Sequence, residues 1–313
     1  MKLISIIIPA YNEEKNIPLV YDEIKKVFEN LKEKYSYEII FIDDGSKDKS
    51  SQAMESLNAK DEKVKYIQFS RNFGKEAATS AGINNAKGDA ALLLDADLQH
   101  PPKLIPEFLK KWEEGADIVI GVRNKNKSDG IIKKIGSSIF YKIINLISDT
   151  QIIPQSTDFR LLDKTVIQEF NKLTEKNRIT RGLIDWLGFK RDYIYFNADE
   201  RSIGEASYST VKLVKLALST MIAHSFFPLK FAGYLGIAIV SISCPLGLLI
   251  FISKYILKDP WGLSISGSAI LATIILFLIG IVLICLGLMA LYIASIQSEV
   301  INRPLYVARR KKV

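Results

Sequence analysis

The sequence predicts an α/β fold with a mostly parallel sheet, followed by a C-terminal part embedded in a membrane. In the first half of the chain, short apolar runs alternate with stretches of helical character; the second half contains two long uncharged segments. The apolar runs are residues 3–8, 37–42, 64–69, 90–94 and 117–121. The helical stretches are residues 16–31, 49–58, 75–86 and 104–113. Nearly continuous apolar strands that alternate with helices are typical of a parallel sheet covered on both faces.

The two uncharged segments, residues 231–253 and 260–298, predict two transmembrane helices. Each is longer than the ~20 apolar residues that a helix needs to cross a hydrocarbon core. The second is apolar on every face from Ala269 onward, which a surface helix of a soluble domain does not tolerate. A buried core helix is the alternative for each segment.

Basic residues flank the two segments, whereas the loop between them holds only Lys254 and Lys258, partly offset by Asp259. The flanking residues are Lys212, Lys215, Lys230, Arg303, Arg309, Arg310, Lys311 and Lys312. The positive-inside rule therefore predicts a multi-pass protein of the cell (inner) membrane with the N-terminal domain and both termini in the cytoplasm. We expect three parts: an α/β domain at 1–207, an amphipathic juxtamembrane segment at 208–230, and two transmembrane helices with a basic cytoplasmic tail at 231–313. For the juxtamembrane segment, an ordinary amphipathic core helix is the alternative.

Composition and missing motifs exclude several classes of protein. No G-x-G-x-x-G follows the first strand and no P-loop motif occurs, so the sequence supports neither a dinucleotide oxidoreductase nor a P-loop NTPase. Both cysteines fall within the uncharged segments, and the two histidines are too few for a histidine metal site. The net charge of +8 suits anionic partners or mere solubility, and we expect no nucleic-acid partner.

The stretch "DADLQHPP" follows the fourth apolar run and predicts a metal site. Residues i and i+2 of an extended chain project to one side, so Asp95 and Asp97 are expected to converge while Ala96 faces away. Two carboxylates held that close repel each other unless a cation binds there. Mg²⁺ or Mn²⁺ suits oxygen ligands, especially when substrate phosphates complete the shell, and Gln99 would add a further oxygen. A solvated acidic loop is the alternative.

Five motifs in order resemble family 2 glycosyltransferases, most closely the polyisoprenyl-phosphate branch. They are "IIIPAYNEEKNI", "FIDDGSKDKS", "RNFGKEAA", "DADLQHPP" and "STDFRLLD". That branch includes dolichyl-phosphate mannose synthases and bacterial undecaprenyl-phosphate glucosyltransferases, and the two C-terminal spans resemble the latter. The resemblance covers residues 1 to about 210 through several independent motifs, which makes it specific.

This resemblance implies a GT-A (Rossmann-like) catalytic domain that transfers a single hexose, with inversion, from a nucleotide sugar to a polyprenyl phosphate. It also implies a divalent metal and a membrane partner, and it leaves a homo-oligomer open. We expect UDP-glucose as donor; another donor such as GDP-mannose, or a non-catalytic nucleotide-sugar-binding membrane protein, are the alternatives. A processive synthase would carry a Q-x-x-R-W segment, which is absent.

The resemblance also assigns roles to individual residues. The nucleotide pocket would be lined by Pro9, Tyr11, Glu13, Asp43 and Asp95, with Asp43 contacting the base. Asp95 would also lie near the metal, and Asp97 and Gln99 would bind the metal and the diphosphate. Asp158 occupies the place of the catalytic carboxylate, acting as a base or by orienting the acceptor. The acceptor phosphate would be received by Arg123, Lys134, Ser138 and Arg201, of which Arg123 and Arg201 would assist catalysis through their charge.

Three points remain open in the sequence. In "RSIGEASY" Ser207 stands where the family often has a lysine, and either Lys212 or Lys75 could replace that cation. Without the resemblance, Asp158 is equally well a helix N-cap or a structural partner of Arg160. The arginines of "NRITRGLIDWLGFK", Arg178 and Arg181, suit an acceptor loop or a charged surface.

Overall fold

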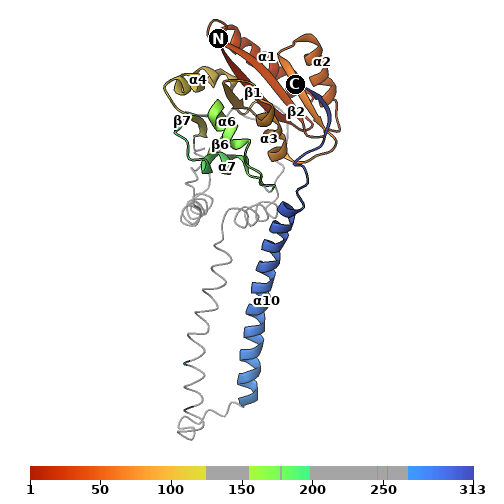
Figure 1. Cartoon of the computed structure of the whole chain (residues 1–313), viewed down its shortest axis with the longest axis vertical. Helices are drawn as coiled ribbons and strands as arrows, with labels where there is room; N and C mark the ends of the chain where they lie inside the picture. The colour runs from red at the N-terminus through yellow and green to blue at the C-terminus, as the bar shows by residue number, and fades with distance from the viewer. Residues whose placement is uncertain (125–154, 177, 198–244, 246–251, 253–266) are drawn as a thin grey trace. The chain divides into compact units, whose positions relative to one another are not determined.

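The computed structural model describes residues 1–124, 155–176, 178–197, 245, 252 and 267–313 (Figure 1). The chain divides into two compact units. The first consists of Met1–Ser207 together with Asn302–Val313, and the second is Tyr208–Ile301.

The described residues of the first unit form an eight-stranded sheet in the order β7-β5-β6-β4-β1-β2-β3-β8. Its strands are β1 (Lys2–Ala10), β2 (Tyr35–Asp43), β3 (Val64–Phe69), β4 (Ala90–Leu93), β5 (Ile118–Arg123), β6 (Ser156–Asp163), β7 (Arg191–Phe196) and β8 (Ala308–Lys312). Its helices are α1 (Asn16–Glu29), α2 (Ser50–Lys60), α3 (Lys75–Asn85), η1 (Pro102–Leu104), α4 (Ile105–Glu113), α6 (Lys164–Phe170) and α7 (Thr180–Trp186). The predicted α/β architecture and its five predicted strands are confirmed.

The sheet is mixed, with a parallel centre. Strands β3, β2, β1 and β4 are parallel neighbours, and β5 and β7 are also parallel. Two of the three strands that the sequence analysis did not predict break this rule, because β6 runs antiparallel to both β4 and β5, and β8 runs antiparallel to β3. The sheet is therefore parallel through the predicted strands and antiparallel where β6 and β8 join it.

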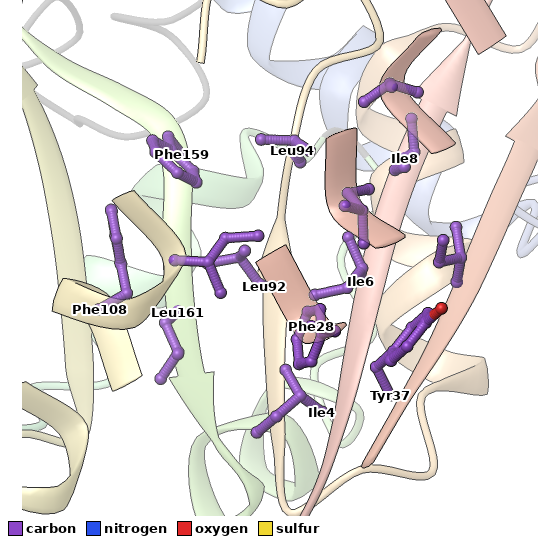
Figure 2. Close-up of a cluster of buried hydrophobic side chains, with 14 of the residues drawn as sticks. Ile4, Ile6, Ile8, Phe28, Tyr37, Leu92, Leu94, Phe108, Phe159 and Leu161 are labelled. Atoms are coloured by element: carbon purple, nitrogen blue, oxygen red, sulfur yellow. The ribbon is translucent and has the colours of Figure 1, made fainter. Parts of the chain in front are cut away.

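Apolar side chains cover both faces of the sheet, as the nearly continuous apolar strands require. On one face, Ile4, Ile6 and Ile8 of β1 pack with residues of α1, α2 and α4 (Figure 2). On the other face, Ile7 packs with residues of α3, α6 and α7. Gly82 of α3 allows close packing there, since a Cβ at this position would lie 2.1 Å from Cγ2 of Ile7. The loops at the strand ends are thus carried by a rigid, buried sheet.

The C-terminal segment differs from the expected basic tail. Residues Ala308–Lys312 form β8 and pair with β3 from Tyr66 to Phe69. The backbone N–H of Ser70 also donates to the carbonyl of Val307 at 2.9 Å, and the ring of Tyr306 stacks on Phe69 at 4.6 Å. The end of the chain is therefore an edge strand of the first unit.

In the second unit the structure describes one helix, α10 (Gly267–Val300), which covers most of the second predicted span. The first predicted span and the segment 208–230 lie almost entirely outside the described residues. Within the described part of the chain, no helix meets the length and hydropathy expected of a membrane span.

Candidate active site

Strand direction brings the predicted site residues to one edge of the sheet. The parallel strands β1, β2 and β4 end at this edge, and ligands of open parallel sheets bind beyond such ends. Because β6 is antiparallel, it begins where β4 ends, with Arg160 opposite Leu93. Strand β5 ends beside the start of β6, with Val122 opposite Ser156. Asp95, Arg123 and Asp158 consequently lie at the same edge.

Lys75, the first residue of α3, joins the two predicted active-site carboxylates. Its Nζ lies 2.6 Å from Oδ1 of Asp95 and 2.8 Å from Oδ2 of Asp158. Arg181 approaches the other oxygen of Asp158, with Nε 4.0 Å from Oδ1. Asp95, Lys75, Asp158 and Arg181 therefore form a row of alternating charge, which we call the charge row.

The charge row keeps Asp158 ionised. Burial alone would raise the pKa of this carboxyl, but the charges of Lys75 and Arg181 and the hydrogen bond from Lys75 outweigh that effect and lower the pKa to about 2. Burial likewise opposes the charge of Lys75, yet Asp95 and Asp158 raise the pKa of its ammonium above the usual value. At neutral pH the site thus holds a carboxylate between two cations.

Two loops fix the position of Lys75. The carboxylate of Asp44, which is buried, accepts hydrogen bonds from the backbone N–H groups of Phe73 at 2.7 Å and Gly74 at 3.0 Å. Gly74 has φ +98°, a conformation that favours glycine. A Cβ on Gly45 would lie 2.3 Å from the carbonyl carbon of Arg71, so the two loops pack too closely for a side chain there. The motifs "DDGS" and "RNFGK" therefore act together to present Lys75.

Asp95 is held by His100, a residue to which the sequence analysis gave no role. The backbone N–H of Asp95 donates to Nδ1 of His100 at 3.3 Å, and the imidazole stacks on Phe159 at 5.2 Å. Burial lowers the pKa of His100, more than the nearby carboxylates raise it, so the ring is neutral and its Nδ1 is an acceptor. The one feature of the sequence that could have indicated a role for His100 is its position within the motif "DADLQHPP".

The predicted metal ligands lie in a turn and not in an extended chain. Strand β4 ends at Leu93, and Leu98 has φ 60°. Ala96 is buried, as expected. The backbone N–H of Gln99 donates to Oδ1 of Asp97 at 3.1 Å. The prediction that Asp95 and Asp97 converge because the chain is extended therefore had the wrong backbone geometry, although both residues do follow β4.

The donor set fits a hard divalent cation only in part. Carboxylate oxygens of Asp95 and Asp97 are suitable ligands for Mg²⁺ or Mn²⁺. The side-chain oxygen of Gln99 instead accepts a hydrogen bond from Nη2 of Arg123 at 2.8 Å. Among the described residues, no group of three or more His, Cys, Asp and Glu side chains gathers as a metal site. Two carboxylates remain, which would need ligands from a substrate to complete a coordination shell.

The residues expected to bind the nucleotide surround the ends of β1 and β2. Pro9 lies in β1, and Tyr11 just beyond it is exposed. Glu13 accepts a hydrogen bond from Nδ2 of Asn16 at 2.6 Å. Asp43 is fully buried; its Oδ1 accepts from the backbone N–H of Ser46 at 2.8 Å, whereas its Oδ2 has no hydrogen-bond partner in the described part of the chain. A buried acceptor without a partner is costly unless a ligand donates to it.

The structure decides between the open readings of Asp158. This residue lies within β6, so it is not a helix N-cap, a role that Asp163 fills for α6. Arg160 is fully buried and binds Asp185 through both Nη atoms, at 2.8 and 3.3 Å. The structural role considered for Asp158, as the partner of Arg160, therefore belongs to Asp185.

The remaining predicted residues divide into three groups. Lys134, Ser138 and Arg201 lie outside the described residues, as does Lys212. Arg178 is buried and donates to the backbone carbonyls of Leu173 and Glu175, which is a structural role. Arg181, in contrast to Arg178, lies beside Asp158 and is part of the charge row.

Carboxylates, arginines and a bridging lysine gathered at the carboxyl edge of a sheet are typical of the ligand site of an α/β enzyme. Residues 5–170 match the model of "Glycosyl transferase family 2", and the chain belongs to this family. It is a glycosyltransferase, and the resemblance seen in the motifs is confirmed.

Proteins named as glycosyltransferases match almost the whole chain. An "Uncharacterized glycosyltransferase YkcC" of Bacillus subtilis is 40% identical over 98% of this chain and 93% of its own length. An "SfII prophage-derived bactoprenol glucosyl transferase" of Shigella flexneri is 37% identical over 98% of this chain and 97% of its own length. A crystal structure of mannosyl-3-phosphoglycerate synthase from Rubrobacter xylanophilus shares the fold, with a TM-score of 0.51 at 17% identity over 70% of this chain and 72% of that chain. This likeness supports the expected GT-A fold.

Proposed function

We propose that this glycosyltransferase transfers one glucose, with inversion, from UDP-glucose to a polyprenyl phosphate at the cytoplasmic face of a membrane. The observation that carries the proposal is the charge row, in which Lys75 joins Asp95 to Asp158 at the carboxyl edge of the sheet. The near full-length similarity to a protein named bactoprenol glucosyl transferase supports both the sugar and the lipid acceptor.

The chemistry follows from the ionisation of both reactants. A phosphate monoester has a second pKa of about 6, so an acceptor phosphate is largely a dianion at neutral pH and needs little help from a base. The carboxylate of Asp158, held between Lys75 and Arg181, then orients the acceptor, because its lowered pKa makes it a poor proton acceptor. An acceptor oxygen forms the new bond to the anomeric carbon while the bond to the nucleoside diphosphate breaks.

The harder task is to bring one phosphate beside a diphosphate. Guanidinium groups are suited to this because they bind phosphate oxygens through paired hydrogen bonds and stay charged. Arg123, at the end of β5, donates a hydrogen bond to Gln99, which belongs to the motif after β4. Arg201 is expected to assist Arg123 in binding the phosphates. The family often has a lysine at the position of Ser207, and either Lys75 or Lys212 could supply the missing cation. Lys75 is favoured because its ammonium lies at the site, 2.6 Å from Asp95.

A divalent metal, Mg²⁺ or Mn²⁺, would be held by Asp95 and Asp97 together with the donor diphosphate. Such an ion supplies electrostatic stabilisation of the departing diphosphate. The hydrogen bond between Gln99 and Arg123 gives Gln99 a different task, which is to position that arginine.

Attachment to the inner membrane is part of the proposal. Large apolar side chains of α10 are exposed along its length, from Leu271 to Val300, and apolar surface of this extent needs an apolar environment. Strand β8 pairs with β3, so the C-terminus shares a compartment with the catalytic unit. Together with the basic flanks, these observations support two crossings with both termini in the cytoplasm.

The direct test is a transfer assay with the full chain in detergent. Radiolabelled UDP-glucose, GDP-mannose and other nucleotide sugars are each offered with undecaprenyl phosphate, with and without a chelator. We expect a lipid-linked glucose product that disappears on chelation and returns with Mg²⁺ or Mn²⁺. A mannosyl product would correct the donor, and absence of turnover with every sugar would favour a non-catalytic nucleotide-sugar-binding protein.

A further inference from the structure

A small pocket beside Asp158 contains Thr180, a polar residue that the proposed mechanism does not use. Its lining includes Lys75, Asp158, Thr180, Arg181 and Arg160, contributed by α3, β6 and α7. Arg123, the one described residue expected to receive the acceptor phosphate, does not lie in this lining.

Two side chains in the pocket have hydrogen-bonding capacity to spare. Thr180 is buried, with 4% of its surface exposed, and its Oγ1 has no hydrogen-bond partner within the described residues. The guanidinium of Arg181 has Asp158 as its nearest described carboxylate, at 4.0 Å, which is beyond hydrogen-bonding distance. A buried hydroxyl without a partner beside an arginine with unused donors is a site prepared for an anionic oxygen ligand.

The backbone that carries these two residues is firmly held. The backbone N–H of Thr180 donates to Oε2 of Glu76 at 2.7 Å, which ties α7 to α3 next to Lys75. From the other side, Nη1 of Arg160 reaches the carbonyl of Arg181 at 3.4 Å and the carboxylate of Asp185 at 2.8 Å. Glu76 and Asp185, the other carboxylates near the pocket, are therefore already engaged with protein donors.

We propose that Thr180 and Arg181, with Lys75, form a binding subsite for the phosphate of the acceptor lipid. This inference rests on the proposed function and names residues of the same site. Inversion requires the acceptor oxygen to approach from the side opposite the departing diphosphate. Along the charge row, Asp95 marks the donor side and Arg181 stands at the far end, beyond Asp158. A phosphate bound by Arg181 and Thr180 would thus face the donor across Asp158.

The test measures equilibrium binding to the full chain in detergent, with farnesyl phosphate as the acceptor probe and UDP as the donor probe. We expect Arg181→Gln to weaken farnesyl phosphate binding roughly 10- to 100-fold and to change the Kd of UDP less than about 3-fold. Thr180→Val, which keeps the shape and removes the hydroxyl, is expected to weaken farnesyl phosphate binding roughly 5-fold, whereas Thr180→Ser restores it. Lys172→Gln removes one positive charge from an exposed pair with Glu169 and serves as the matched control.

Several outcomes would overturn the subsite. These are a farnesyl phosphate affinity of Arg181→Gln equal to that of Lys172→Gln, a loss confined to UDP, or no binding of farnesyl phosphate by the wild type. Farnesol, which lacks the phosphate, must bind the wild type and Arg181→Gln alike. Because the assay needs no turnover, a wild type that transfers no sugar but binds farnesyl phosphate through Arg181 would refute the proposed function and leave the subsite standing.

Discussion

Lys75 is the residue on which the electrostatics of the site depend. It contacts the carboxylate of Asp95, in the loop after β4, and the carboxylate of Asp158, in β6. These two residues lie 63 positions apart in the chain. Without the ammonium, these two anions would face each other, and Asp158 would lose the nearer of the two cations that keep it ionised. Lys75 therefore acts on both the donor side and the acceptor side.

We predict that Lys75→Gln lowers kcat roughly 10- to 100-fold, because one preorganised positive charge is lost beside the reacting phosphates. Lys75→Arg should recover part of this loss, since the charge is kept while its geometry changes. Steady-state kinetics with both substrates measure the effect. Lys110→Gln, which removes an exposed lysine paired loosely with Glu114, controls for net charge. A kcat within 2-fold of that control would show that the bridging lysine is dispensable.

The sequence allowed the carboxylates of the site and Arg123 to be predicted, but it left open which cations contact Asp158. Asp95 and Asp158 stand in motifs whose order along the chain is recognisable. Lys75 remained one of two alternatives, because its contact with Asp158 depends on an antiparallel strand 83 residues away. Arg178 and Arg181 were equivalent in sequence, and only the local fold turns the first toward backbone carbonyls and the second toward Asp158. Arg178 precedes α7 and Arg181 lies in its first turn, so no single period relates the directions of the two side chains.

At the level of elements, one buried carboxylate links the central strands. Glu38 of β2 accepts hydrogen bonds from Oγ of Ser5 in β1 at 2.6 Å and from the backbone N–H of Lys87 at 2.9 Å, and pairs with Lys65 of β3 at 2.5 Å. Burial raises its pKa, but the hydrogen bonds from Lys65, Ser5 and Lys87 prevail and leave the pKa below its usual value. Ionised Glu38 therefore stabilises the register of three neighbouring strands.

We predict that Glu38→Gln lowers the thermal midpoint at neutral pH by about 3–10 °C, for a loss of about 1–3 kcal/mol from a buried, hydrogen-bonded ion pair. Since the folded pKa is depressed, this stability is present above the unfolded pKa of about 4.3. It is lost as pH falls through the lower folded value. The midpoints of wild type and Glu38→Gln should therefore converge as the pH falls below the unfolded pKa and through the lower folded pKa. Glu114→Gln is the exposed control, and a difference independent of pH would contradict the linkage.

Strand β8 completes the sheet with the least apolar sequence of all the strands described. Its five residues, ARRKK, are exposed, and only Arg310 has a described acidic partner, Glu55 at 3.5 Å. The pairing depends on backbone hydrogen bonds to β3 and on the stacking of Tyr306 against Phe69. Basic residues on an edge strand also discourage further strand pairing.

We predict that Tyr306→Ala loosens β8 and lowers the thermal midpoint by about 2–6 °C, whereas Tyr306→Phe stays within about 1 °C of the wild type. The ring stacks at 4.6 Å with 16° between the planes, so its apolar face carries the contact. Differential scanning calorimetry of both variants measures the effect. If alanine and phenylalanine behave alike, the stacked ring does not hold the strand.

Two strands that the sequence analysis missed, β6 and β8, share a physical reason. Strands β1 to β5 are apolar runs of the kind that burial on two faces requires, and they were predicted to within a few residues. Strand β8 carries no apolar alternation, and β6 carries Asp158 and Arg160 within its hydrogen-bonded run. Their partners lie far away in the chain, so pairing is decided by tertiary structure and not by local pattern.

For the whole molecule, the return of the chain to its first unit constrains the topology. Asn302–Val313 belongs to the same unit as Met1–Ser207, while Tyr208–Ile301 lies between them in sequence. Since β8 must pair with β3, both ends of the chain lie in one compartment. If the intervening segment enters a membrane, as we propose, the number of complete crossings is even.

We predict that alkaline phosphatase fused after Val313 is inactive in bacterial cells, whereas green fluorescent protein at the same position is fluorescent. Alkaline phosphatase fused after Lys258, between the two predicted spans, should be active, because it becomes active only outside the cytoplasm. The pairing of β8 supplies the physical reason, since a C-terminus carried across the membrane would have to abandon its contacts with Tyr66 and Phe69. Active phosphatase at Val313 would place the C-terminus outside the cytoplasm and contradict the proposed orientation. Inactive phosphatase at both positions would mean that the chain does not cross the membrane, and the catalytic unit would then meet its lipid from the surface alone.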